Sequence, residues 1–183
     1  MKHIKFVLIT LGILLTRGYD YISTRNFTPD LSKEANPLVS IFGFKWIGLT
    51  ITLVLLTTYS LYALYVNTYK KIDILPKEKE LSFEKFTSLV YLGYKARWVD
   101  LLYKLPNNLS RFNYVFGHIF SRSLLWAGLI TTVMWILIYT SKKYVSTYHN
   151  VLFIYGIIII GCFIISYLYF RKLYKIYKAL QTS

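Results

Sequence analysis

Residues 151–170 read VLFIYGIIIIGCFIISYLYF and contain no charged side chain. At a rise of 1.5 Å per residue, a helix of this length extends about 30 Å, which matches the hydrocarbon core of a bilayer. The stretch therefore predicts a transmembrane helix. The sequence RKLYKIYK at 171–178 follows directly and predicts a basic amphipathic tail over 171–183.

Three more apolar stretches, over about 4–24, 37–66 and 114–140, predict three further transmembrane helices. The composition agrees, because 55% of the 183 residues are hydrophobic and only 16% are charged, against about 25% charged in soluble proteins. We predict an all-α integral membrane protein, a four-transmembrane-helix bundle that forms a single membrane domain over residues 1–183.

The fully apolar part of the stretch over 4–24 is short. Residues 6–16 extend only about 16 Å as a helix. The preceding MKH would suit a signal peptide, but RGYD at 17–20 follows in place of a small-residue cleavage site. We favour a retained helix. Such a helix must carry Arg17 and Asp20 into the outer part of the membrane.

Residues 67–113 form a long basic segment between the second and third predicted helices. Charged residues in this segment make a spanning role unfavourable, yet its apolar side chains recur at helical spacing. The pattern predicts one or two amphipathic helices in the headgroup region, separated at Gly93. The apolar positions that define the pattern are Phe86, Leu89, Val90, Tyr94, Trp98, Leu101, Leu102 and Leu105.

Lys and Arg residues are distributed unequally between the two sides of the predicted bundle. The N-terminus, the middle segment and the C-terminal tail hold 15 of the 22, and the two opposite loops hold 5. The positive-inside rule places both termini and the middle segment in the cytoplasm, with the chain in the inner cell membrane. The net charge of +14 then indicates anionic phospholipids at the cytoplasmic face as partners, and no nucleic acid.

A polar cluster is predicted at the outer ends of the first two helices. Asp20 and Thr24 are four residues apart and share a helix face. Glu34 and Asn36 lie where the second helix begins, because Asn36 can cap the free N–H groups and Pro37 suits the first helical position. The predicted cluster is Asp20, Thr24, Glu34, Asn36 and Lys45.

Lys45 is the most costly member of this cluster. It falls eight residues past Pro37, about 12 Å along a continuous second helix. An ion at that depth costs about 2.5 kcal/mol or more, so Lys45 should snorkel outward or pair with a carboxylate such as Asp20. The alternative interpretation is that these residues only cap a helix and mark the water interface.

This part of the chain resembles small multi-pass membrane proteins of bacteria and archaea that are grouped as a domain of unknown function. The resemblance covers about residues 10–60, a quarter of the chain, and leaves the basic middle segment outside. Because no activity is established for that family, the resemblance implies a membrane location and adds little about mechanism. The matching pattern, Asp-x-x-x-Thr, Glu-x-Asn-Pro and then Lys, is carried by Asp20, Thr24, Glu34, Asn36, Pro37 and Lys45.

A second pair, His118 and Arg122, lies four residues apart at the cytoplasmic end of the third predicted helix. Arg122 is interpreted as the inner anchor of that helix or as a contact to a lipid phosphate. The single cysteine, Cys162, has no partner for a disulfide or a metal site. We predict no catalytic residues, no metal and no cofactor, because the usual signature motifs are missing.

Three functional hypotheses remain open from the sequence. The first, and preferred, is a non-enzymatic structural, accessory or interaction module, either as a homo-oligomer or with a membrane-complex partner. The second is a transporter of a small solute or ion that uses the outer polar cluster. The third is an intramembrane enzyme acting on a lipid or isoprenoid substrate, which requires Asp20 and Glu34 to converge.

Overall fold

The computed structural model describes residues 2–32, 34 and 36–182, and helices are the only regular elements among them. Four of these helices are long and apolar enough to cross a membrane. Among the described residues this agrees with the four apolar helices predicted from the sequence. The helical segments are α1 (Lys2–Phe27), α2 (Pro37–Ser40), α3 (Trp46–Tyr69), α4 (Phe83–Tyr91), η1 (Trp98–Leu102), α5 (Leu109–Thr140), η2 (Tyr144–Tyr148) and α6 (Val151–Thr182).

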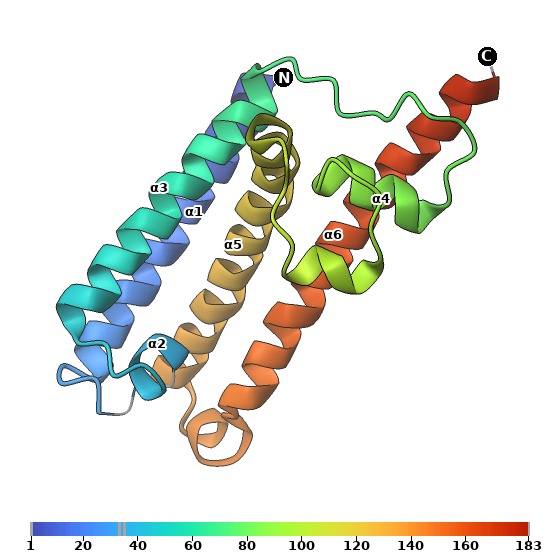
Figure 1. Cartoon of the computed structure of the whole chain (residues 1–183). Helices are drawn as coiled ribbons and strands as arrows, with labels where there is room; N and C mark the ends of the chain where they lie inside the picture. Colours follow the sequence, from blue (N-terminus) through green and yellow to red (C-terminus); the bar gives the residue numbers. More distant parts are fainter. Residues whose placement is uncertain (1, 33, 35, 183) are drawn as a thin grey trace.

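Helix α5 is the centre of the arrangement, because α1, α3 and α6 all pack against it (Figure 1). Helices α1 and α3 also contact each other, whereas α6 leans away from them, and α4 contacts both α5 and α6. We call the end with α2 and the α5–α6 connection the α2 end. The opposite end, which holds the N-terminus and the start of α5, is the N-terminal end.

Small residues bring the helices around α5 into close contact. A Cβ atom on Gly117 would lie 2.0 Å from the carbonyl oxygen of Ala63 on α3. A Cβ on Gly128 would lie 2.1 Å from Thr16 Oγ1 on α1, and one on Gly161 would lie 1.9 Å from the Trp126 indole nitrogen. Glycine at these positions lets the backbones approach, as at helix interfaces in membranes.

The predicted second helix over 37–66 is not continuous, which corrects the sequence-based boundary. The start is as predicted, because the Asn36 side chain accepts from the Leu38 N–H and Pro37 opens α2. The chain then leaves the helix at Ile41 and passes Gly43 at φ +66° before α3 begins. A glycine adopts this left-handed conformation at little cost, so it supplies the break that the apolar pattern hid.

This break also overturns the predicted depth of Lys45. The residue is the N-cap of α3, in extended conformation, and its side chain is exposed. The prediction assumed eight helical residues between Pro37 and Lys45. With only residues 37–40 helical before it, Lys45 lies at the start of α3 rather than about a quarter of the way along a continuous helix.

The basic middle segment folds onto α5 and the C-terminal half of α6. As predicted, Gly93 separates two helical pieces, α4 and η1, and it does so at φ +88°. The apolar face of α4 joins a buried cluster that reaches the C-terminal tail, which the structure makes part of α6. The members of this cluster are Ile74, Leu81, Phe86, Val90, Val115, Tyr169, Phe170 and Tyr177.

Helical segment η1 and the chain just after it leave large apolar side chains exposed, among them Leu102 and Leu105 at 80% and 84% exposure. Asp100 holds this segment together by accepting from the Arg97 N–H at 2.9 Å and from the Tyr103 hydroxyl at 2.8 Å. These hydrogen bonds, the backbone one first, lower the pKa of Asp100 to about 2.

Candidate functional site

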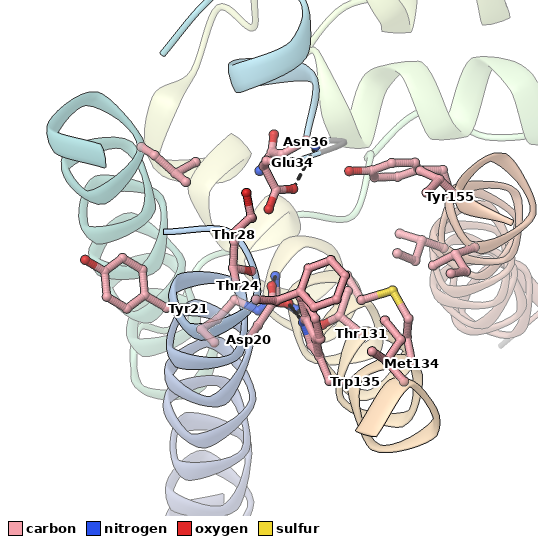
Figure 2. A pocket seen from close by; sticks show the side chains of 18 of the residues that line it. Asp20, Tyr21, Thr24, Thr28, Glu34, Asn36, Thr131, Met134, Trp135 and Tyr155 are labelled. Atoms are coloured by element: carbon pink, nitrogen blue, oxygen red, sulfur yellow. Dashed lines mark hydrogen bonds and ion pairs between the residues drawn. The ribbon is translucent and has the colours of Figure 1, made fainter. Parts of the chain in front are cut away.

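A cavity of about 310 Å³ lies at the α2 end of the bundle, where α1, α3, α5 and α6 meet the loop before α2 (Figure 2). This volume is at the lower end of the range for small-molecule sites. Figure 2 shows Asp20, Thr24 and Glu34 facing the same space as Tyr155 of α6. We call this space the α2-end cavity.

The structure brings four of the five residues of the predicted polar cluster to the α2-end cavity. Asp20, Thr24, Glu34 and Asn36 all line it. Lys45 does not, since it lies outside the lining and is exposed at the start of α3. The predicted pair between Lys45 and Asp20 is therefore wrong.

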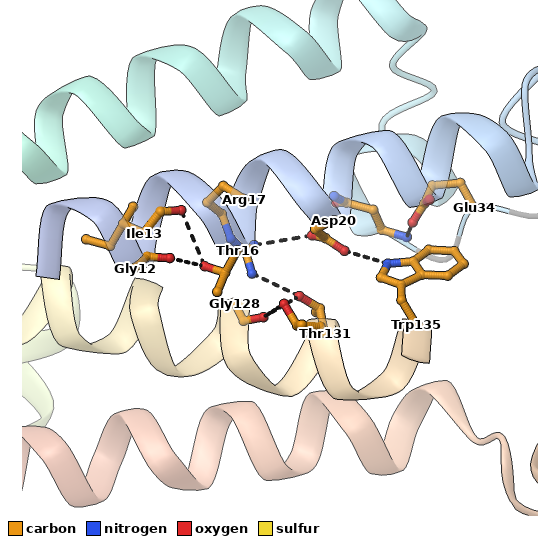
Figure 3. A network of polar contacts seen from close by, with 11 residues as sticks. Gly12, Ile13, Thr16, Arg17, Asp20, Glu34, Gly128, Thr131 and Trp135 are labelled. Atoms are coloured by element: carbon orange, nitrogen blue, oxygen red, sulfur yellow. Dashed lines mark hydrogen bonds and ion pairs between the residues drawn. The ribbon is translucent and has the colours of Figure 1, made fainter. Parts of the chain in front are cut away.

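Arg17 takes the place that the prediction assigned to Lys45. Its guanidinium lies 3.4 Å from Asp20 Oδ2, and its Nη2 donates to Thr131 Oγ1 at 3.0 Å (Figure 3). The indole nitrogen of Trp135 donates to the other oxygen of Asp20 at 2.8 Å. Because Arg17 and Asp20 are on α1 and their partners are on α5, this polar network ties the two helices together.

Sequence reasoning missed Thr131 and Trp135 as members of this network. Both are more than 100 residues from Asp20 and lie in an apolar stretch. Their spacing of four does place them on one face of α5, which is the only local signal that they act together. Nothing in that spacing indicates which helix the face meets.

The loop before α2 is folded by its own polar side chains. Glu34 Oε1 accepts from the Asn36 N–H at 2.8 Å, and Asn36 Oδ1 accepts from the Leu38 N–H at 3.0 Å. These two bonds close a tight turn of the type that Asx side chains form. The turn holds Glu34 and Asn36 at the cavity, across from Asp20.

Apolar and aromatic side chains make up the rest of the cavity wall. Tyr21 and Trp46 pack edge to face at 5.4 Å between ring centres, and Tyr21 also shares a hydrogen bond with Thr50. The wall therefore combines a polar network on one side with apolar surface on the other. Its aliphatic members on three helices are Leu49, Leu53, Ala127, Met134, Ile138, Val151, Ile154 and Ile158.

The second predicted pair is not joined into one site. The His118 ring stacks on Tyr169 with 4.0 Å between ring centres, and it is absent from both cavities. Arg122 instead lines a second cavity of about 790 Å³ at the N-terminal end. Its Nη1 donates back to the His118 carbonyl oxygen at 3.0 Å.

Among the described residues, no group of three or more His, Cys, Asp or Glu side chains is placed to hold a metal ion. The lining of the α2-end cavity includes one guanidinium, one imidazole (His149), two carboxylates, one amide, hydroxyls and apolar groups. No family model matches the chain, and neither a curated protein nor a solved structure matches it.

Proposed function

We propose that the chain is an integral membrane protein that crosses the inner cell membrane with α1, α3, α5 and α6. The flanks of these helices expose large apolar side chains, such as Leu15 at 70%, Ile47 at 76% and Leu152 at 82%, and surfaces of this kind belong in contact with lipid. The excess of Lys and Arg at the N-terminal end supports placing that end, with both termini, in the cytoplasm. The α2-end cavity then faces outward.

Within that membrane frame, we propose a non-enzymatic binding module that holds a small amphiphilic molecule in the α2-end cavity. One observation carries this proposal: a single cavity has a polar network on one side and aliphatic side chains from α3, α5 and α6 on the other. An amphiphile satisfies both sides, because its head group meets Arg17 and Thr131 while its apolar part covers the aliphatic wall.

The hydrogen bond and the ion pair that Asp20 already forms favour a binding role for the cavity over a catalytic one. One of its carboxylate oxygens accepts from Trp135 and the other pairs with Arg17. A general base needs an oxygen within reach of the substrate proton, and both oxygens of Asp20 already have protein partners. Glu34 Oε1 likewise accepts from the Asn36 N–H.

The packing below the cavity favours a binding site over a transport path. Below the α2-end cavity, α5 is in close contact with α1 at Gly128 and with α6 at Gly161, and further along with α3 at Gly117 beside the second cavity. Ile13 and Ser60 are fully buried in the same region. A solute in the α2-end cavity would have to separate these helices in order to cross.

The proposal is tested with a brominated lysophosphatidylcholine carrying a 12-carbon chain, titrated into protein in nanodiscs. Trp46 and Trp135 line the cavity, so bromine in the cavity quenches their fluorescence once Trp98 and Trp126 are changed to Phe. We expect saturable quenching. Ala127→Phe, which fills the cavity from α5, should weaken the apparent affinity at least fivefold.

Ile136→Phe is the matched control, because Ile136 lies on the same helix, is 47% exposed and is outside the cavity lining. This variant should retain the affinity of the parent protein. Circular dichroism checks that both variants keep their helices. Non-saturable quenching that is equal in the Ala127→Phe and Ile136→Phe proteins would exclude a specific site for the amphiphile.

A further inference from the structure

The second cavity, at the N-terminal end, differs from the first in its charge. It measures about 790 Å³ and lies between α1, the end of α3, the chain after α3, α5 and α6. Asp73 is the single acidic residue of its lining among the described residues. Six cationic residues line it, and they are Lys2, Lys5, Lys70, Lys71, Arg122 and Lys172. We call this space the basic cavity.

The six cations of the basic cavity have no carboxylate partner within the described part of the chain. Every ion pair among the described residues involves Arg17, Lys95, Arg97 or Lys104, and none of these four lines the basic cavity. Asp73, the one acidic lining residue, accepts from the Leu75 N–H at 3.3 Å. The cations therefore repel one another across a shared space, and an anion in that space would relieve the repulsion.

Arg122 distinguishes the basic cavity from a surface run of lysines. Asn67, near the end of α3, contacts Tyr114 of α5 at 2.9 Å, and Arg122 is eight residues, about 12 Å, further along α5. Its side chain is half-buried and reaches back to line the cavity. A cation at that depth is costly unless it has a partner.

The guanidinium of Arg122 is also oriented by the protein. Its Nη1 donates to the His118 carbonyl oxygen at 3.0 Å and lies 3.4 Å from Ser121 Oγ. Its Nη2 has no acceptor among the described residues. A guanidinium anchored on one side and open on the other is suited to a phosphate group, for which its planar donors match the oxygen geometry.

Two neutral polar side chains of the lining are already used within the fold. Asn67 Nδ2 donates to the Tyr114 carbonyl oxygen, and Thr68 Oγ1 donates to the Leu64 carbonyl oxygen. The cations are therefore the main groups left to contact an anion. They come from four separate parts of the chain, so only the folded bundle assembles them.

We infer that the basic cavity binds a phosphate-bearing anion, with the half-buried Arg122 at the centre and Lys5, Lys71 and Lys172 around it. The phosphate can belong to the head group of an anionic lipid or to a soluble phosphorylated compound. This site lies at the opposite end of the bundle from the α2-end cavity. The inference is therefore independent of the amphiphile proposed there.

The experiment compares two probes on the full chain. In one arm, the protein is placed in phosphatidylcholine nanodiscs that contain phosphatidylglycerol, and native mass spectrometry measures the lipid retained after release. In the other arm, inorganic phosphate is added to protein in pure phosphatidylcholine nanodiscs, and the thermal unfolding midpoint is followed. Retention of phosphatidylglycerol indicates a lipid source, and a raised midpoint with phosphate indicates a soluble one.

Variants test whether the basic cavity is the site. Arg122→Gln and Lys172→Gln should each reduce the retained phosphatidylglycerol, or weaken the phosphate effect, at least fivefold. Lys172 is exposed, so its variant keeps the test valid if Arg122→Gln fails to fold. Lys142→Gln is the charge-matched control, because Lys142 is exposed at the α2 end.

Two outcomes would overturn the inference. In the first, phosphatidylglycerol is retained no better than phosphatidylcholine, and inorganic phosphate does not raise the thermal unfolding midpoint. In the second, Lys172→Gln and Arg122→Gln lose no more binding than Lys142→Gln, which would mean that only the total charge of the protein matters.

Discussion

The close contact between α1 and α5 can be tested by adding a single methyl group. In the Gly128→Ala protein, the new Cβ atom would lie 2.1 Å from Thr16 Oγ1 and 2.7 Å from Thr16 Cβ. Non-bonded heavy atoms need about 3.5 Å, so the helices must separate by about 1 Å at this point. Overpacking of this kind typically costs about 1–3 kcal/mol in the free energy of unfolding.

The same displacement should weaken the polar network that lines the α2-end cavity. Arg17 and Thr131 lie within one turn of the contact between Thr16 and Gly128, and their hydrogen bond is already 3.0 Å long. An added separation of about 1 Å would break it by ordinary distance criteria. Gly128→Ala should therefore reduce both the stability of the protein and the affinity of the cavity.

Unfolding in mixed micelles with increasing dodecyl sulfate, followed by circular dichroism, measures the change in stability. Gly18→Ala is the control, because a Cβ at Gly18 meets no atom within 4 Å, and we expect it to be neutral or stabilising by up to about 1 kcal/mol. In the Gly128→Ala background, Thr16→Gly should restore part of the loss by removing the clashing atoms. A Gly128→Ala protein as stable as the parent would refute the assigned packing.

Two further predictions concern single charged residues. Asp20→Asn removes the carboxylate beside the largely buried Arg17 and should destabilise the protein by about 1.5–3 kcal/mol in the same micelle assay. Lys45→Met should change the stability by no more than about 0.5 kcal/mol, because Lys45 is exposed. Equal effects of the two substitutions would contradict the assigned roles. The hydrogen bonds to Asp100 lower its pKa from 3.8 to about 2, so its contribution to the order of η1 is complete above about pH 4 and is lost as the pH falls through about 2. The ¹⁹F resonance of fluorotryptophan at Trp98 should shift in that window, and a shift unchanged by Asp100→Asn would assign it to another group.

Local patterns in the chain were sufficient for the number and type of the main helices. A run such as 151–170 satisfies its own backbone hydrogen bonds only as a helix, so length and apolar character identify it. The cap at Asn36 and the separation of α4 from η1 at Gly93 are also local, because each depends on one side chain or on one backbone angle. The gathering of Asp20 and Glu34 at one cavity follows from the short connection between their segments.

The tertiary structure decided which charges share a space. Lys45 left the predicted cluster because Gly43 breaks the helix before it, and Arg17 entered because α5 presents Thr131 and Trp135 to α1. The basic cavity is assembled from four separate segments, including residues 5 and 172. Which helix faces meet depends on the shape of small residues such as Gly117 and Gly128 against their neighbours. Hydrophobic periodicity cannot report that shape, because it records only which side of a helix avoids water.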